Sequence, residues 1–293
     1  MKKVGFLFVN LWAYLLSITP FWLLYLRSDV YFLLIYHVAR YRRKVVRQNL
    51  LRSFPEQDLN EIKAIEQRFY HNFCDQVVEM FKLFHMSVDE AERRIQVTNP
   101  EVVTELYAKR KSLFFAFPHS GNWEWFGKRM QTLSGHHPMA IYKKVKNPDF
   151  DRFILDLRTS LPVEMIESDA ALRTLARRND TLDAVLILAD QTSYGLESDY
   201  WNTFLHQETC WFTGLERMSK FLDYAIVFVS MKRQGRGRYE LTFDMITDNP
   251  KATGKGEIME QYSQRIERFI QAQPDNWLWS HRRWKHRRNQ NPA

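Results

Sequence analysis

Short apolar runs alternate with amphipathic stretches from Leu113 onwards, and this alternation constrains the fold of the chain more than any other feature. Strands and helices that alternate at this spacing are typical of an α/β domain, with a largely parallel sheet flanked by helices. Gly235 and Gly237 separate the last two apolar runs and predict a hairpin, so we expect a mixed sheet. The predicted strands are Leu113–Phe117, Met139–Lys143, Val163–Ile166, Ala184–Leu188, Ala225–Met231 and Tyr239–Ile246. The predicted helices are Asn60–Met86, Asp89–Ile95, Trp125–Leu133, Phe150–Ser160, Ala170–Asn179, Gly214–Phe221 and Glu257–Ala272.

The amino-terminal segment from Val4 to Leu26 carries no charged residue. As a helix rising about 1.5 Å per residue it would be about 34 Å long, enough to cross a hydrocarbon core of about 30 Å. A signal peptide fits less well, because the apolar part is too long and no small-residue cleavage site follows it. A buried core helix is the other alternative. We therefore expect a membrane-anchor helix over residues 1–28, a basic helical arm over 29–98 and an α/β domain over 99–293.

Basic residues flank the uncharged segment unequally. Lys2 and Lys3 precede it, and a larger group follows, which predicts that the body of the protein lies on the cytoplasmic side of a membrane. Val30–Ala39 is apolar but too short to span, so we expect it to lie in the bilayer interface or to pack on the domain. The basic group consists of Arg27, Arg40, Arg42, Arg43, Lys44 and Arg47.

The composition argues against several classes of protein. Hydrophobic residues make up 45% of the chain and aromatic residues 15%, which disfavours a disordered chain. The two cysteines, Cys74 and Cys210, lie far apart, so we expect a reducing compartment and no disulfide framework. Neither a P-loop nor a dinucleotide fingerprint is present. His136 and His137 lack carboxylates or cysteines at ligand spacing, so we predict no catalytic metal and no cofactor.

The net charge is +8, and its basic clusters could be solvated surface, but beside a membrane anchor they favour contacts to anionic head groups. The carboxy-terminal run NWLWSHRRWKHRR mixes tryptophan with arginine and lysine, a composition suited to a bilayer surface with anionic head groups. Nucleic acid also fits basic residues interleaved with aromatic ones. We rank nucleic acid lower, because the chain has an apolar segment and no nucleic-acid-binding motif.

The run FFAFPHSGNWEWFG, residues 114–127, contains the strongest candidate for chemistry. On one regular helix, His119 and Glu124 would be separated by about 500° and could not share a face. They can meet if His119 lies in a strand-end loop, made flexible by Gly121, and Glu124 lies in the first helical turn. A carboxylate on one imidazole nitrogen leaves the other free to act as a general base. An acyl-serine mechanism through Ser120 is the alternative, but no nucleophile elbow is present.

These residues and several others occur in the same order as the sequence blocks of a known family. The run Pro118–Glu124 resembles the His-x4-Asp/Glu block of the glycerolipid acyltransferase superfamily. More narrowly, it resembles the bacterial lipid A biosynthesis lauroyl/myristoyl acyltransferases, and the resemblance covers nearly the whole chain. The other similar blocks are Arg40–Leu50, Ser53–Glu56, Tyr142, Asn147-Pro148, Arg158, Asp190-Gln191 and Trp279–Lys285.

The resemblance implies a membrane-bound enzyme of the bacterial inner membrane. It would move a fatty acyl chain from a thioester, on acyl carrier protein or coenzyme A, to a hydroxyl of a lipid A precursor. His119 would take the proton of that hydroxyl, and Glu124 would hold and polarise His119. The resemblance also implies substrate binding by Asn122, Lys143, Arg158, Asp190, Gln191, Arg282 and Arg283.

Two other functions fit parts of the sequence. After Gln191 the family usually has a Phe-Phe-Gly and a threonine-rich run, whereas this chain has Phe204–Thr209, so an acceptor such as a glycerolipid or an amino-acid lipid stays open. A tether that binds anionic lipid or nucleic acid without catalysis is the alternative from another class. Such a tether would need no contact between His119 and Glu124.

Overall fold

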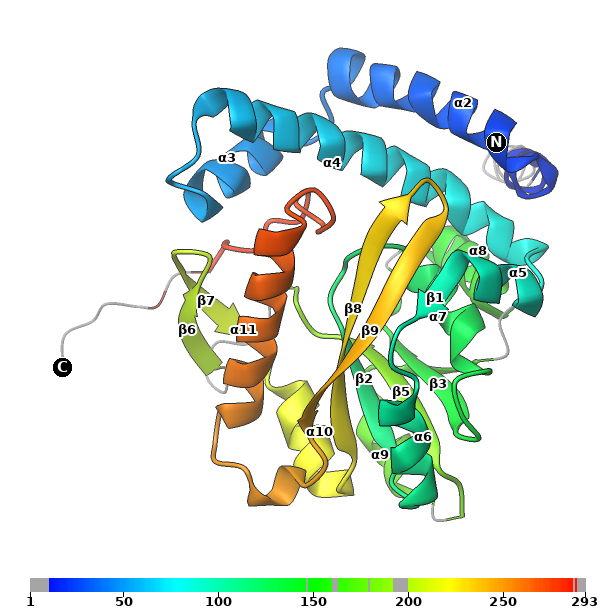
Figure 1. The fold of residues 1–293 in the computed structure, drawn as a ribbon, viewed down its shortest axis with the longest axis vertical. Coiled ribbons are helices and arrows are strands. Elements are labelled where there is room, and N and C mark those ends of the chain that lie inside the picture. The colour runs from blue at the N-terminus through cyan, green and yellow to red at the C-terminus, as the bar shows by residue number, and fades with distance from the viewer. Residues whose placement is uncertain are drawn as a thin grey trace.

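A seven-stranded sheet forms the centre of the computed structural model, which describes residues 11–145, 147–159, 163–178, 180–191, 200–286 and 288. The strand order is β1-β9-β8-β2-β5-β3-β4, and every neighbouring pair is parallel except the predicted hairpin β8–β9 (Figure 1). The expected mixed, largely parallel sheet flanked by helices is therefore confirmed. The strands of this sheet are β1 (Ile95–Val97), β2 (Leu113–Phe117), β3 (His137–Tyr142), β4 (Glu164–Glu167), β5 (Asp183–Leu188), β8 (Ala225–Gly235) and β9 (Arg238–Thr247).

Strand β2 lies at the middle of the sheet and is buried along its whole length. Its side chains alternate between two hydrophobic cores, as expected for a strand covered on both faces. Phe114 packs in the core that contains α11 residues such as Tyr262, and Phe115 packs in the core that contains Phe126 of α7. The helices of this part are α6 (Glu101–Ala108), α7 (Trp123–Met130), α8 (Pro148–Thr159), α9 (Ala171–Ala176), α10 (Gly214–Leu222), η3 (Pro250–Ala252) and α11 (Glu257–Ala272).

The register between β2 and β5 positions the functional loops. Phe117 is paired with Leu188, so the residues that follow the two strands leave the sheet side by side at the same edge. In parallel α/β sheets the carboxyl ends of the strands are where ligands bind. The loop that carries His119 is therefore brought next to Asp190.

Three strands were not predicted from the sequence pattern. Strand β1 is only three residues long, and β6 (Tyr200–Phe204) pairs with β7 (Gln207–Trp211) in a separate hairpin. Leu205 and His206, at the turn of that hairpin, both adopt left-handed conformations with φ of 47° and 62°. Glycine and asparagine are the usual residues there, so the turn lacks the usual sequence signal.

The amino-terminal segment is not one continuous helix in the described part of the chain. Residues 11–18 are helical, the helix is interrupted at Thr19 and Pro20, and α2 (Phe21–Phe32) follows and passes into η1 (Leu33–Val38). Proline disfavours the helical conformation of the residue before it, which explains the break. No helix among the described residues is long and apolar enough to cross a membrane, so the predicted span is not supported. The part of that span before residue 11 lies outside the described residues.

The helical arm packs against the α/β part. Leu24 and Tyr25 of α2 are buried, and α2 lies along α4 at one edge of the molecule (Figure 1). Asp58 caps α4 by accepting hydrogen bonds from the backbone N–H groups of Asn60 and Glu61. The remaining helices of the arm are α3 (Arg43–Ser53), α4 (Leu59–Met80), η2 (Phe81–Phe84) and α5 (Val88–Arg94).

Candidate active site

The loop between β2 and α7 is held by its own sequence and by the carboxy-terminal segment. Asn122 caps α7, because its Oδ1 accepts a hydrogen bond from the backbone N–H of Trp125 at 3.2 Å. Gly121 has a φ of +56°, and a Cβ there would lie 2.9 Å from both the Cγ and the carbonyl oxygen of Met231. The loop therefore needs glycine at this position for both its conformation and its space.

The carboxy-terminal segment 276–278 lies against this loop. The backbone N–H of Leu278 donates to the carbonyl oxygen of His119 at 3.1 Å, and the backbone N–H of Gly121 donates to Oδ1 of Asn276 at 3.1 Å. Ser120 and Trp277 form an isolated antiparallel bridge between these contacts. The loop is consequently fixed from both sides, which holds the backbone of His119 in place.

His119 is paired with Asp190. Nδ1 of His119 lies 2.6 Å from Oδ1 of Asp190, and the backbone N–H of His119 donates to Oδ2 at 2.9 Å. The indole N–H of Trp277 donates to the same Oδ2 at 2.8 Å. The other ring nitrogen of His119, Nε2, lies 3.1 Å from the amide nitrogen of Gln191.

These contacts indicate the tautomer of His119. Burial alone would raise the pKa of Asp190, but its electrostatic interaction with the His119 ring and the hydrogen bonds from His119 and Trp277 outweigh burial and lower this pKa below its ordinary value. Asp190 is therefore a carboxylate, which can only accept a hydrogen bond, and Nδ1 must carry the proton between them. Nε2 is then the basic nitrogen, and it accepts the amide N–H of Gln191.

Glu124 has a different partner from the one that the sequence suggested. Arg158 of α8 reaches across from the neighbouring helix and contacts both carboxylate oxygens of Glu124, with a distance of 3.0 Å from Nε to Oε2. The indole N–H of Trp123 donates to Oε1 at 3.2 Å. The expected pairing of His119 with Glu124 is thus replaced by two pairs, His119 with Asp190 and Glu124 with Arg158. The reason is the register of β2 and β5, which puts Asp190 at the imidazole.

A pocket of about 360 Å³ opens between this loop and the helical arm. Glu124, Gln191 and His281 contribute polar groups, and burial lowers the pKa of His281 to about 4, so its imidazole is neutral near pH 7. The opposite wall is mostly apolar and comes from the arm, with Tyr41, Phe73, Val77 and Met80. The pocket therefore combines polar groups beside the loop with apolar surface, a combination suited to an amphiphilic ligand.

The structure brings together only part of the predicted substrate-binding set. Asn122, Arg158, Asp190 and Gln191 surround the His119 loop, whereas Lys143 is exposed beyond the end of β3. Arg282 is exposed as well. Arg283 is buried over the ring of Trp211, with 4.5 Å from its Cζ to the ring centroid, and burial lowers its pKa to about 10.

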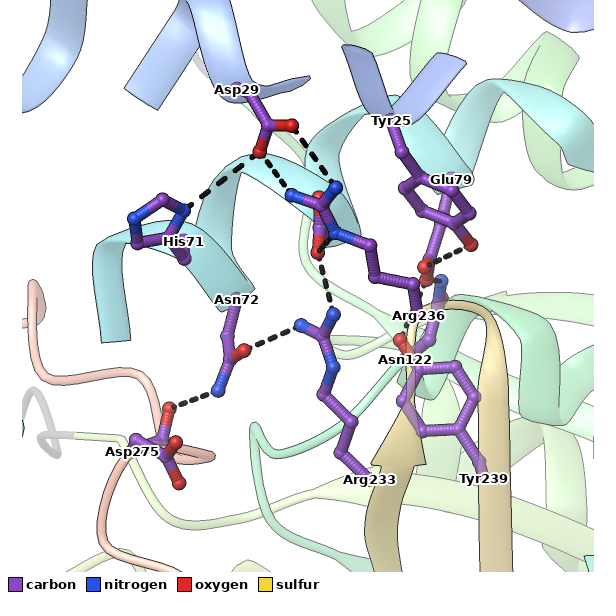
Figure 2. Close-up of polar contacts among 11 residues, drawn as sticks. Tyr25, Asp29, His71, Asn72, Glu79, Asn122, Arg233, Arg236, Tyr239 and Asp275 are labelled. Atoms are coloured by element: carbon purple, nitrogen blue, oxygen red, sulfur yellow. Dashed lines mark hydrogen bonds and ion pairs between the residues drawn. The ribbon is translucent and has the colours of Figure 1, made fainter. Parts of the chain in front are cut away.

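Glu79 is a buried residue near the site that the sequence reasoning missed. Its carboxylate accepts hydrogen bonds from Tyr239 at 2.6 Å, and from Tyr25 and the cap residue Asn122 at 2.9 Å each (Figure 2). Its carbonyl oxygen also accepts the indole N–H of Trp125 at 3.0 Å. Glu79 therefore connects the arm to the first turn of α7. The sequence pattern gave no clear signal, because the residues three and four before Glu79 on α4, Gln76 and Asp75, are polar, and only the structure shows that Glu79 is buried.

The imidazole of His119 follows a strand of an α/β fold, is held by the buried carboxylate of Asp190 and lies next to a pocket. This arrangement is suited to general-base catalysis. The family model described as bacterial lipid A biosynthesis acyltransferase matches residues 2–286. The chain therefore belongs to the bacterial lipid A biosynthesis acyltransferase family, and the resemblance seen in its motifs is confirmed. No curated protein matches the sequence.

Proposed function

We propose that this acyltransferase moves a fatty acyl chain from an acyl thioester, on acyl carrier protein or coenzyme A, to a hydroxyl of a lipid A precursor. The observation that carries the proposal is the His119–Asp190 pair at the carboxyl edge of the sheet, beside a pocket with polar and apolar walls. The family match supports acyl transfer in lipid A biosynthesis.

The first step is attack by the acceptor hydroxyl on the thioester carbonyl. The hydroxyl takes the place of the Gln191 amide at Nε2 of His119 and gives its proton to that nitrogen. A bond forms between the hydroxyl oxygen and the carbonyl carbon, and the carbon–sulfur bond then breaks. The leaving thiolate receives the proton from His119, which restores the neutral imidazole. Asp190 stabilises the imidazolium between the two transfers.

Glu124 keeps a catalytic role in the proposal, with a different task from the expected one. Its carboxylate lines the pocket and accepts a hydrogen bond from Trp123, whose ring lies 5.2 Å from that of His119. Glu124 would accept a hydrogen bond from the acceptor lipid and orient the hydroxyl towards His119. Arg158 fixes the carboxylate from the other side. Asn122 would act by positioning, because it caps the helix that carries Glu124.

The exposed cations Lys143 and Arg282 would bind phosphate groups of the donor or acceptor, and Arg283 would support the tail that presents Arg282. We place the enzyme at the cytoplasmic face of the bacterial inner membrane, where an amphiphilic acceptor would be available. A glycerolipid or amino-acid lipid is the alternative acceptor, because the chain differs from the family pattern after Gln191.

The direct test is acyl transfer by purified enzyme in mixed micelles, with acyl carrier protein as donor and a lipid A precursor as acceptor. We expect His119→Ala to lower the rate by about 10²–10⁴, the usual contribution of a general base. The matched control is His137→Ala, because His137 is exposed and pairs with Glu164 at 2.8 Å on the sheet itself. Equal rates for the two variants would refute the general-base role.

Identification of the acceptor needs lipid mass spectrometry of cells with and without the protein. Acylated lipid A species should disappear together with the protein. Changes confined to phospholipids or amino-acid lipids would refute the lipid A assignment but not acyl transfer. Lipid binding that is salt-sensitive and needs no turnover would instead favour the non-enzymatic tether.

A further inference from the structure

Glu79 of α4 holds the chain on both sides of Glu124. Its Oε2 accepts a hydrogen bond at 2.9 Å from the side-chain amide of Asn122, which comes two residues before Glu124. Its backbone carbonyl oxygen accepts the indole N–H of Trp125, the residue after Glu124, at 3.0 Å. Both contacts are buried. Glu124, which lines the pocket, therefore lies between two residues that are bound to the same buried residue.

The contact with Glu79 also determines which way the side-chain amide of Asn122 faces. An amide has one end that donates and one end that accepts. Glu79 binds the donating end, so the accepting oxygen faces the backbone N–H of Trp125 and caps α7. A reversed amide would put two donors together at the helix end and two acceptors together at the carboxylate. The carboxylate of Glu79 therefore favours the one orientation in which Asn122 caps the helix.

Glu79 is itself fixed in place. Its carboxyl group is fully buried and accepts the hydroxyl of Tyr239 on β9 at 2.6 Å and that of Tyr25 on α2 at 2.9 Å (Figure 2). The ring of Tyr239 also meets the ring of Trp125 edge-on, with 5.9 Å between the centroids. Rotation of this carboxyl group away from Asn122 would leave buried polar groups unpaired. The sheet, α2 and α4 thus jointly determine where the first turn of α7 lies.

We propose that Glu79 is a positioning residue of the active site, which holds Glu124 in place through the residues on either side of it. The inference rests on the proposed acyl transfer, in which Glu124 orients the acceptor hydroxyl towards His119. Glu79 would act through its neighbours and not on the substrate. A displacement of about 1 Å at a group that orients a reacting atom can lower the rate by about a hundredfold.

Paired substitutions test the hydrogen bond between positions 79 and 122, with kcat measured at pH 8. The conservative variant Glu79→Gln should keep most of the activity, because its amide oxygen can accept from Asn122 and its amide nitrogen can donate to the hydroxyl oxygen of Tyr25. Asn122→Asp should lower kcat about tenfold to a hundredfold, because it puts a second carboxylate against that of Glu79. The double variant Glu79→Gln/Asn122→Asp should recover activity, since a reversed glutamine amide donates to the aspartate, which still caps α7.

Glu79→Leu removes the side-chain hydrogen bonds altogether. We expect it to lower kcat, normalised to folded protein, by about a hundredfold and to leave the KM for the thioester donor unchanged. Glu66→Leu is the matched control, because Glu66 is also fully buried on α4 but pairs with Arg43 and Arg47 of α3. Equal losses of kcat in the two leucine variants, or no recovery in the double variant, would overturn the proposal.

Hydrogen exchange gives a readout that does not depend on acyl transfer. Asn122 binds the backbone N–H of Trp125, so Glu79→Leu should speed exchange in the first turn of α7, and Glu66→Leu should not. Equal exchange of this turn in both variants would overturn the inference even if transfer proceeds as proposed. Transfer that survives His119→Ala would instead refute the general-base role, and exchange would still decide whether Glu79 holds this turn.

Discussion

The carboxylate partner of His119 is the detail at the residue scale on which the chemistry depends. Asp190 is buried, accepts three hydrogen bonds and is held ionised by them. A buried carboxylate that cannot rotate away keeps the proton on Nδ1 and the lone pair on Nε2. The same carboxylate would stabilise the positive charge that develops on the imidazole during attack.

Asp190→Asn should therefore nearly abolish turnover while leaving the fold intact. An amide N–H facing Nδ1 would favour the opposite tautomer, with the proton on Nε2, and the expected loss in kcat is about 10³–10⁴. Asp183→Asn is the matched control, because Asp183 is also buried but sits at the opposite end of β5, where it binds Arg178 and Tyr224. Rates normalised to folded protein should separate the two variants, and equal losses would contradict the assigned role of Asp190.

The Arg158–Glu124 pair gives a second prediction at this scale. Lysine keeps the charge but cannot contact both carboxylate oxygens as the guanidinium does. Loss of one charged hydrogen bond corresponds to about 1.5–3 kcal/mol, so Arg158→Lys should slow transfer by about tenfold to a hundredfold. Arg178→Lys is the control, since Arg178 likewise makes two ion-pair contacts, one with Asp183 and one with Glu164, away from the pocket. A rate for Arg158→Lys equal to that of the control would argue against a positioned Glu124.

At the element scale, Glu79 connects four separate pieces of structure. Tyr25 belongs to α2, Glu79 to α4, Tyr239 to β9, and Asn122 caps α7. A buried carboxylate with three neutral donors is satisfied in its hydrogen bonds but still loses the solvation of its charge. Burial accordingly raises the pKa of Glu79, although the hydrogen bonds from Tyr239, Asn122 and Tyr25 oppose it.

This raised pKa predicts how stability changes with pH. The folded protein holds a proton on Glu79 at pH values where the unfolded chain has lost it, so the free energy of unfolding falls as pH rises above the ordinary value of about 4.3. Glu79→Gln should remove this contribution. The free energy of unfolding, measured with urea, should therefore fall more between pH 5 and pH 8 for wild type than for the variant. Glu61→Gln on the same helix is the control, because Glu61 is about half exposed. The prediction would be contradicted if the free energy of unfolding had the same pH dependence in wild type, Glu79→Gln and Glu61→Gln.

At the scale of the whole molecule, the amino-terminal arm contributes to the core. Ala13, Leu16 and Leu24 are buried together with Val78 and Phe81 of the following helices. Phe32 and Tyr36 join the main core with strand residues. Removal of residues 11–26 would thus remove part of the packed interior.

Two substitutions on α2 test whether one face of this helix packs on the body of the protein. Leu24→Ala should lower the free energy of unfolding by about 2–5 kcal/mol, because it empties a fully buried position. Trp22→Ala should change it by no more than about 0.5 kcal/mol, because Trp22 is largely exposed. Urea unfolding in detergent-free buffer measures both. Equal stabilities for the two variants would mean that α2 does not pack on the body.

The sequence alone determined much of this protein because local patterns carry the relevant information. Period-two and helical patterns located the strands of the main sheet except the short β1, and the glycine turn located the β8–β9 hairpin. The position of His119 in a loop after a buried strand was also a local property. The motifs and their order in the chain were sufficient to identify the family. These motifs also singled out Arg158, Asp190 and Gln191 as site residues. They did not show which side chains these residues contact.

Only the tertiary structure decided which side chains meet. Asp190 lies 71 residues from His119 in the chain, and the register of β2 and β5 makes them neighbours. No periodicity in the sequence encodes that register, because it is set by packing on both faces of the sheet. The same holds for the amino-terminal segment. An uncharged run has the same composition whether lipid or protein covers it, and in the described residues α4 covers one face of α2 and leaves the other exposed.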